Sequence, residues 1–99
     1  MTNHVEIAEV GAMSKTHAES AAKLFNQTAR FNSQIRDLNP QADTFMIADS
    51  GPNHGKWALS ITADEHPGVT GVLDEVTEDA QTVCRSVTGA DKHPVKVFA

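Results

Sequence analysis

The sequence has few of the features that mark secreted or membrane proteins. Cys84 is its single cysteine, so no intrachain disulfide can form and a reducing, intracellular setting is expected. No apolar run approaches the roughly 20 residues that cross a bilayer. The first residues, MTNHVEIAEV, have neither the basic nor the apolar part of a signal peptide. We therefore expect a cytoplasmic protein.

Basic residues are also scarce. Eight lysines and arginines stand against 13 aspartates and glutamates, which gives a net charge of −5 in 99 residues. Non-specific nucleic-acid binding draws most of its strength from neutralising phosphates, so direct binding to DNA or RNA is not expected. A chain of this length is expected to form one α+β domain, residues 1–99, with its own hydrophobic core.

Alternation of apolar and polar residues predicts the strands. The clearest case is KWALSITA, residues 56–63, which alternates strictly over its whole length. Residues 4–10 alternate as well, but the pattern breaks at Glu9 and Val10, where that strand is expected to end or bulge. The expected strands are residues 4–10, 44–49, 56–63 and 94–99.

Apolar residues at intervals of three and four predict two helices. The first is expected over residues 16–37, with Thr16 and Glu19 at the spacing of a capping box. The second follows Pro67–Gly68 and ends at Gly89, which stands where a left-handed cap belongs. The expected apolar stripes are Ala21, Leu24, Thr28, Phe31, Ile35 and Leu38 in the first helix, and Val69, Val72, Leu73, Val76, Ala80, Val83 and Val87 in the second.

The order of these elements is strand, helix, strand, strand, helix, strand. Two right-handed strand–helix–strand crossings joined by a hairpin give a four-stranded antiparallel sheet with both helices on one face. The sequence therefore predicts an α+β fold of the βαββαβ, ferredoxin-like kind. The alternative is an α+β sandwich in which residues 4–10 stay irregular.

The stretch DSGPNHGKWALS, residues 49–60, is similar to a phosphate-binding loop. Such a loop needs four residues between its glycines and a Ser or Thr after its Lys, and a helix must follow. Here Gly51 and Gly55 enclose three residues, Trp57 occupies the hydroxyl position, and a strand is expected next. The stretch therefore predicts a hairpin turn, and no nucleotide cofactor is expected.

The histidines and the cysteine show no catalytic or metal-binding pattern. No two of the five histidines pair at i, i+4 on one helix, so no metal site is expected. His54 is the histidine of most interest, because it is expected at an exposed hairpin tip beside Lys56, where both could contact a partner. Cys84 has no base near it on the second helix and is predicted to be a small buried residue, not a nucleophile.

One face of the expected sheet is left open by the helices. It should carry Lys56, Ala58, Ser60 and Thr62, with either Phe45 and Ile47 or Met46 and Ala48 beside them. This surface is rather apolar for contact with water, and such surfaces commonly pack against a second copy of the chain. The aromatic pair with which open sheets stack on RNA bases is missing. A homodimer through the sheet face is therefore expected.

The polar side of the second expected helix is strongly acidic. Asp74, Glu75, Glu78 and Asp79, called the acidic face below, form two like-charge pairs at i, i+4. Each such pair destabilises a helix by about 0.2 to 0.5 kcal/mol. The plainest interpretation is an ordinary solvated face. Two more specific interpretations are a docking patch for a basic partner and, less favoured, part of a metal site.

The absence of a catalytic constellation in the sequence favours a binding role over catalysis. We expect a small non-catalytic cytoplasmic interaction module, homodimeric, that binds a protein partner through the acidic face, with His54 and Lys56 as further contacts. Two alternatives stay open. One is a small-ligand-binding or small-molecule enzyme domain with a pocket between sheet and helices or at a dimer seam. The other is an acidic inhibitor that competes with nucleic acid for a basic partner surface.

Overall fold

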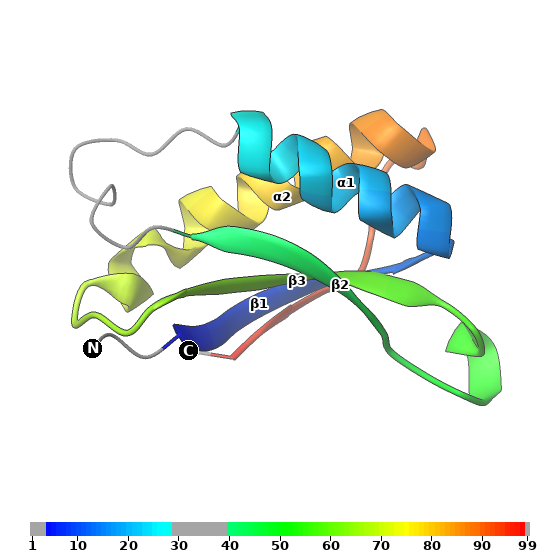
Figure 1. Ribbon diagram of the computed structural model, residues 1–99, viewed down its shortest axis with the longest axis horizontal. Coiled ribbons are helices and arrows are strands. Elements are labelled where there is room, and N and C mark those ends of the chain that lie inside the picture. The colour runs from blue at the N-terminus through cyan, green and yellow to red at the C-terminus, as the bar shows by residue number, and fades with distance from the viewer. Residues whose placement is uncertain (1–3, 29–39, 99) are drawn as a thin grey trace.

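The computed structural model describes residues 4–28 and 40–98 (Figure 1). Within these ranges the elements are β1 (His4–Met13), α1 (Lys15–Thr28), β2 (Gln41–Met46), the 3₁₀ helix η2 (Gly51–Asn53), β3 (Trp57–Asp64), the 3₁₀ helix η3 (Val69–Val72), α2 (Leu73–Thr88) and β4 (Val95–Val97). Four strands form one antiparallel sheet in the order β2-β3-β1-β4. Figure 1 shows α1 and α2 on the same side of this sheet. The predicted α+β class is confirmed.

The hydrophobic core lies between the sheet and the two helices. Its largest fully buried side chains come from both layers: Ile7, Val10, Leu59 and Ile61 from the strands, and Phe25, Val76 and Cys84 from the helices. Removing apolar area from water stabilises a fold by about 25 cal/mol per Å², so this layer is the main source of stability. The described helices leave the opposite face of the sheet uncovered (Figure 1).

Helix α1 is capped by Ser14, so the prediction that Thr16 opens it was wrong. Ser14 Oγ accepts a hydrogen bond from the His17 N–H at 3.2 Å, and the Ser14 carbonyl accepts the Ala18 N–H at 2.9 Å. A side-chain oxygen at this position satisfies an amide that the first turn of a helix leaves without an intrahelical partner. The part of the predicted helix beyond Thr28 lies outside the described residues.

The buried stripe of α1 also differs from the predicted one. Its buried side chains are Ala18, Ala21, Ala22 and Phe25, at the i, i+3, i+4, i+7 spacing of one helix face. Phe25 is fully buried, whereas the predicted Leu24 is only partly buried against the core. The remaining apolar residues of the predicted stripe, Phe31, Ile35 and Leu38, lie outside the described residues.

The second helix follows its prediction closely. Its first turn, Val69–Val72, is a 3₁₀ helix, and the α-helix begins at Leu73. Gly89 adopts a left-handed conformation with φ of 78°, and its N–H donates to the Arg85 carbonyl at 2.9 Å. This is the predicted glycine cap, which another residue would adopt only with strain. The predicted stripe is confirmed, because its residues belong to the core or pack against it.

Strand β1 continues to Met13. Of the two outcomes expected near Glu9 and Val10, an end of the strand was wrong and a bulge is confirmed; the alternative in which residues 4–10 stay irregular was wrong as well. The pairing of β1 with β3 shifts between Glu6 and Ala8 and again between Val10 and Met13. At such a bulge two residues of one strand oppose one residue of its partner, so the side-chain alternation changes phase. The break in the sequence pattern is therefore a bulge within a longer strand.

The other three strands were predicted with different success. Strand β2 spans Gln41–Met46, three residues earlier than the predicted 44–49. Strand β3 is displaced by one residue from the predicted 56–63, and β4 lies within the predicted 94–99.

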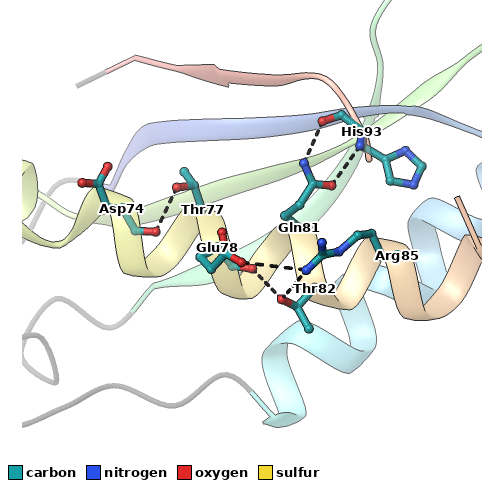
Figure 2. A network of polar contacts seen from close by, with 7 residues as sticks. All are labelled: Asp74, Thr77, Glu78, Gln81, Thr82, Arg85 and His93. Carbon is teal, nitrogen blue, oxygen red and sulfur yellow. Dashed lines mark hydrogen bonds and ion pairs between the residues drawn. The ribbon is translucent and has the colours of Figure 1, made fainter. Parts of the chain in front are cut away.

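Each helix is tied to the chain beside it by one side-chain amide. In α1, Asn26 Nδ2 donates to the Ala42 carbonyl at 2.9 Å and Asn26 Oδ1 accepts the Ala42 N–H at 2.8 Å. In α2, Gln81 Nε2 donates to the His93 carbonyl at 2.8 Å and Gln81 Oε1 accepts the His93 N–H at 3.0 Å (Figure 2). Each side-chain amide bonds both the backbone N–H and the backbone carbonyl of one residue. It thus replaces the two hydrogen bonds that a neighbouring strand would supply.

Candidate functional site

The acidic face occupies the first turns of α2. Asp74, Glu75 and Glu78 are exposed, and Asp79 is partly buried. Asp74 and Glu75 lie in the first turn, where the positive end of the helix dipole stabilises carboxylates by about 0.3 to 1 kcal/mol each. That stabilisation fades beyond the first turn, so Glu78 and Asp79 receive less of it. The predicted acidic residues are thus held together on a helix whose other side is anchored in the core.

The one basic residue of α2 is Arg85. Its Nη2 lies 3.8 Å from Glu78 Oε1 and also donates a hydrogen bond to Thr82 Oγ1 at 3.3 Å (Figure 2). Arg85 and Glu78 are both well exposed, and an ion pair of this kind contributes only about 0 to 1 kcal/mol. Such a weak contact can be exchanged for a contact with a partner at little cost.

Asp79 is the partly buried carboxylate of the acidic face. Its pKa is raised above the ordinary value by burial, and the carboxylates of Glu75 and Glu78 raise it further. A carboxyl group whose pKa is raised in the folded state favours folding below the unfolded pKa, and this stability is lost as the pH rises through the folded pKa. The acidic face therefore becomes less favourable as Asp79 ionises, and a bound cation would relieve the repulsion.

The hydroxyl groups of α2 are turned back onto the helix. Thr77 Oγ1 donates to the Leu73 carbonyl at 2.8 Å, and Thr82 Oγ1 donates to the Glu78 carbonyl at 2.9 Å. Carboxylates are therefore the main polar groups that this face presents. Among residues 4–28 and 40–98 no group of three or more His, Cys, Asp or Glu side chains is arranged to hold a metal ion.

The hairpin between β2 and β3 is confirmed as a turn, since β3 and not a helix follows it. Gly51 and Gly55 both have positive φ, 79° and 68°, which favours glycine at these positions. His54 and Lys56 are exposed, as predicted for a contact site. Figure 1 shows this turn and the first turn of α2 near opposite ends of the molecule. The two predicted contact regions therefore do not form one site.

The register of the strands decides which residues share the open sheet face. Phe45 pairs with Ala58, so the face carries Phe45 and Ile47 and not the alternative pair, Met46 and Ala48. The neighbouring row across all four strands is polar. It runs from Asp43 on β2 through Ser60 and Glu9 to Lys96 on β4. The open face is thus more polar than the sequence indicated, because β1 contributes carboxylates to it.

A shallow pocket of about 220 Å³ lies on this open face, beside the hairpin. We call it the hairpin pocket; its lining residues are Glu9, Gly11, Ile47, Asn53, Pro94, Val95 and Lys96. A Cβ atom on Gly11 would lie 3.1 Å from Ile47 Cδ1, so the pocket depends on the missing side chain of Gly11. Burial raises the pKa of Glu9, repulsion from Glu6 raises it further, and Lys96 opposes the shift. The sequence pattern gave no sign of this pocket.

Cys84 is buried, as predicted, and has no exposed surface. Burial raises the pKa of its thiol to about 12, so the reactive thiolate is scarce at neutral pH. Cys84 is therefore part of the core.

His93 is the one buried histidine among the described residues, and the sequence did not single it out. Thr88 Oγ1 donates to the Cys84 carbonyl at 2.9 Å. Thr88 Oγ1 also lies 2.7 Å from His93 Nε2, a hydrogen-bond contact between the end of α2 and the segment before β4. Together with the Gln81 amide, these bonds fix the segment that leads into β4.

Comparison with known proteins returned no matching family model, no matching curated protein and no matching solved structure. In the described part of the chain, neither α1 nor α2 has the length and apolar character needed to cross a membrane.

Proposed function

We propose that the protein is a small non-catalytic cytoplasmic interaction module that binds a basic protein surface through the acidic face of α2. A ferredoxin-like layout is part of this proposal. The strand order β2-β3-β1-β4 supports it, because that layout places the first and third strands at the centre and the fourth beside the first. We also retain the proposal that the protein is a homodimer.

The observation that carries the proposal is the concentration of carboxylates on two successive turns of α2. The exposed Asp74, Glu75 and Glu78 point from a helix that the core holds in place, so a partner meets them already organised. Opposed charge speeds encounter and selects partners more than it adds raw affinity. Relief of the repulsion at Asp79 adds to the attraction of a cationic partner.

The double variant Asp74→Lys/Glu78→Lys tests this function. A fluorescent oligolysine peptide is titrated into the protein, and binding is followed by anisotropy at low and at physiological salt. We expect the variant to bind about tenfold more weakly than the natural chain, with the difference shrinking as salt screens the charges. Circular dichroism checks that both proteins remain folded.

The matched control is Asp49→Lys/Asp91→Lys, which makes the same change in net charge. Asp49 lies near the hairpin turn and Asp91 follows α2, and both are exposed. We expect this control to lose less than threefold in affinity. Equal losses in the two variants would mean that net charge alone binds the peptide, and the proposal would be wrong.

The hairpin pocket supports a second candidate, a small-ligand-binding domain. The pocket joins a carboxyl group, Glu9, and an ammonium group, Lys96, with apolar walls, a set that suits a small polar molecule. Native mass spectra of the purified protein should then show added mass that leaves on activation. In Gly11→Ala the new methyl group enters the pocket beside Ile47, and this added mass should be lost. A native mass equal to that expected from the sequence of the natural chain would count against this candidate.

A further inference from the structure

The two edges of the sheet differ in how many of their outward backbone groups are already hydrogen-bonded. In an antiparallel pair, residues alternate between those whose N–H and carbonyl face the neighbouring strand and those whose groups point away. The Ile47 N–H bonds to the Lys56 carbonyl at 3.0 Å, and by alternation the outward groups of β2 belong to Ala42, Thr44 and Met46. Backbone groups at an open edge are a template for another strand, so proteins commonly block them.

Edge β2 is blocked over its first half, at Ala42 and Thr44. Both outward groups of Ala42 are taken by the Asn26 amide of α1, at 2.9 and 2.8 Å. The outward N–H of Thr44 is taken by Asp43 Oδ1 at 2.8 Å. A second strand could not pair along this edge without displacing these bonds.

Edge β4 has no such cover in the described part of the chain. The Gly11 N–H donates to the Pro94 carbonyl and the Phe98 N–H to the Ile7 carbonyl, each at 2.9 Å. Between them Lys96 pairs with Glu9, so the groups of Val95 and Val97 point away from β1. Their side chains are 41% and 48% exposed, so this edge presents apolar surface beside open backbone groups.

We propose that β4 pairs in antiparallel fashion with β4 of a second copy of this chain, joining the two sheets edge to edge. The two-fold axis passes beside Val97, and each Val97 donates its N–H to the Val97 carbonyl of the second copy. This inference deepens the homodimer part of the proposed function by naming its interface. It does not depend on the acidic face.

The side chains select this register among the three that the outward groups of Val95 and Val97 permit. Pairing Val95 with Val97 of the second copy would place the two Lys96 ammonium groups opposite each other, which is destabilising. Pairing Val95 with itself would set Lys96 against Pro94, which offers the ammonium group neither an opposite charge nor an aromatic ring. Centred on Val97, the register sets each Lys96 opposite Phe98 of the second copy.

In this register the second copy places an aromatic ring, Phe98, opposite each Lys96. Within one chain Lys96 Nζ lies 5.2 Å from the centroid of the Phe98 ring, and Phe98 of the second copy would offer the same ammonium group a second cation–π contact. Packing through the open sheet face is less favourable, because two copies would bring the carboxylates of Glu6, Glu9 and Asp43 together and bury them.

The substitution Val97→Pro tests the seam with little effect on the single chain. Proline removes an N–H, and the Val97 N–H points away from β1, so no bond within the sheet is lost. Sedimentation velocity over a concentration series should show a dimer for the natural chain and at least about tenfold weaker association for the variant. Met46→Pro makes the same change at an outward position of β2 and should leave association unchanged.

Amide hydrogen exchange followed by NMR gives a second readout that does not depend on the proline variant folding. The Val97 amide should exchange at least about tenfold more slowly at dimerising concentration than at high dilution, whereas the Met46 amide should not change. Phe98→Lys should also weaken the dimer, since it sets Lys96 against a second ammonium group.

The outcomes separate the possible occupants of the edge. A natural chain that stays monomeric at high micromolar concentration overturns the second-copy proposal, and slow Val97 exchange in such a monomer would indicate a different strand on the edge. A dimer that survives Val97→Pro moves the interface elsewhere and also overturns it. Neither result changes the expected binding of oligolysine by the acidic face. Failure of the β4 dimer and failure of the binding function can therefore be told apart.

Discussion

Replacement of Phe25 by alanine is expected to lower the free energy of unfolding by about 3 to 5 kcal/mol. Phe25 is the largest fully buried side chain and contacts the core from α1. Its loss removes apolar contact area and leaves a cavity, because the sheet and α2 on either side can collapse only partly. Domains of this size have roughly 5 to 15 kcal/mol in total, so the variant retains a fraction of its stability. Urea unfolding followed by circular dichroism measures the change.

Phe98→Ala is the matched control, measured at a concentration where the chain is monomeric. The same atoms are removed, but the Phe98 side chain is 43% exposed, so we expect a loss of about 1 kcal/mol or less. Phe25→Leu should lie between the two, since leucine fills most of the site. Similar losses for Phe25→Ala and Phe98→Ala would contradict the placement of the core under α1.

The elements that could be predicted from sequence are those whose pattern is repeated many times along the chain. Strand β3 alternates over its whole length and α2 carries an apolar stripe ended by a glycine cap, so each residue supports the same assignment. The acidic face followed from the same periodicity, because the residues opposite a buried stripe must be exposed. Its placement on the helix was predictable, whereas no pattern in the sequence identifies a molecule that binds it.

The wrong predictions for α1 arose where the local sequence pattern fits two different structures. In α1 the apolar residues Leu24 and Phe25 are adjacent, and following the period through Leu24 selects the neighbouring row of the helix. The packing of Ala18, Ala21 and Phe25 against the sheet decides between the two. The spacing of Thr16 and Glu19 fits a capping box, but it lies inside the helix, because Ser14 already caps it.

Other features depend on contacts between residues far apart in sequence. The early start of β2 coincides with the bonds between Asn26 and Ala42, 16 residues apart, which hold a segment of weak strand propensity beside the sheet. The Gly11 floor of the hairpin pocket and the register shift between Glu6 and Ala8 likewise appear only once β1 is paired with its neighbours. Propensity and periodicity describe one segment at a time, so neither could reveal them.

The substitution Gln81→Ala is expected to cost about 2 to 4 kcal/mol, more than the side chain's size alone would indicate. Gln81 is buried, and its amide satisfies both the N–H and the carbonyl of the buried His93 (Figure 2). Alanine leaves both backbone groups without these partners, and the cost is that of unpaired buried polar groups rather than of a lost contact. Urea unfolding measures the loss. Gln27→Ala, at an exposed position of α1, should change stability by about 0.5 kcal/mol or less.

The position of the Gln81 amide links this loss to the proposed dimer. His93 immediately precedes Pro94, whose carbonyl accepts the Gly11 N–H at the start of the β1–β4 pairing. Loosening His93 should therefore speed amide exchange at Gly11 and Phe98, which bond across β1 and β4, and weaken dimerisation, while the Ala42 amide at the other edge stays protected. If stability falls but Gly11 and Phe98 exchange as before, the Gln81 amide serves the core alone. In that case edge β4 is positioned by its own pairing with β1.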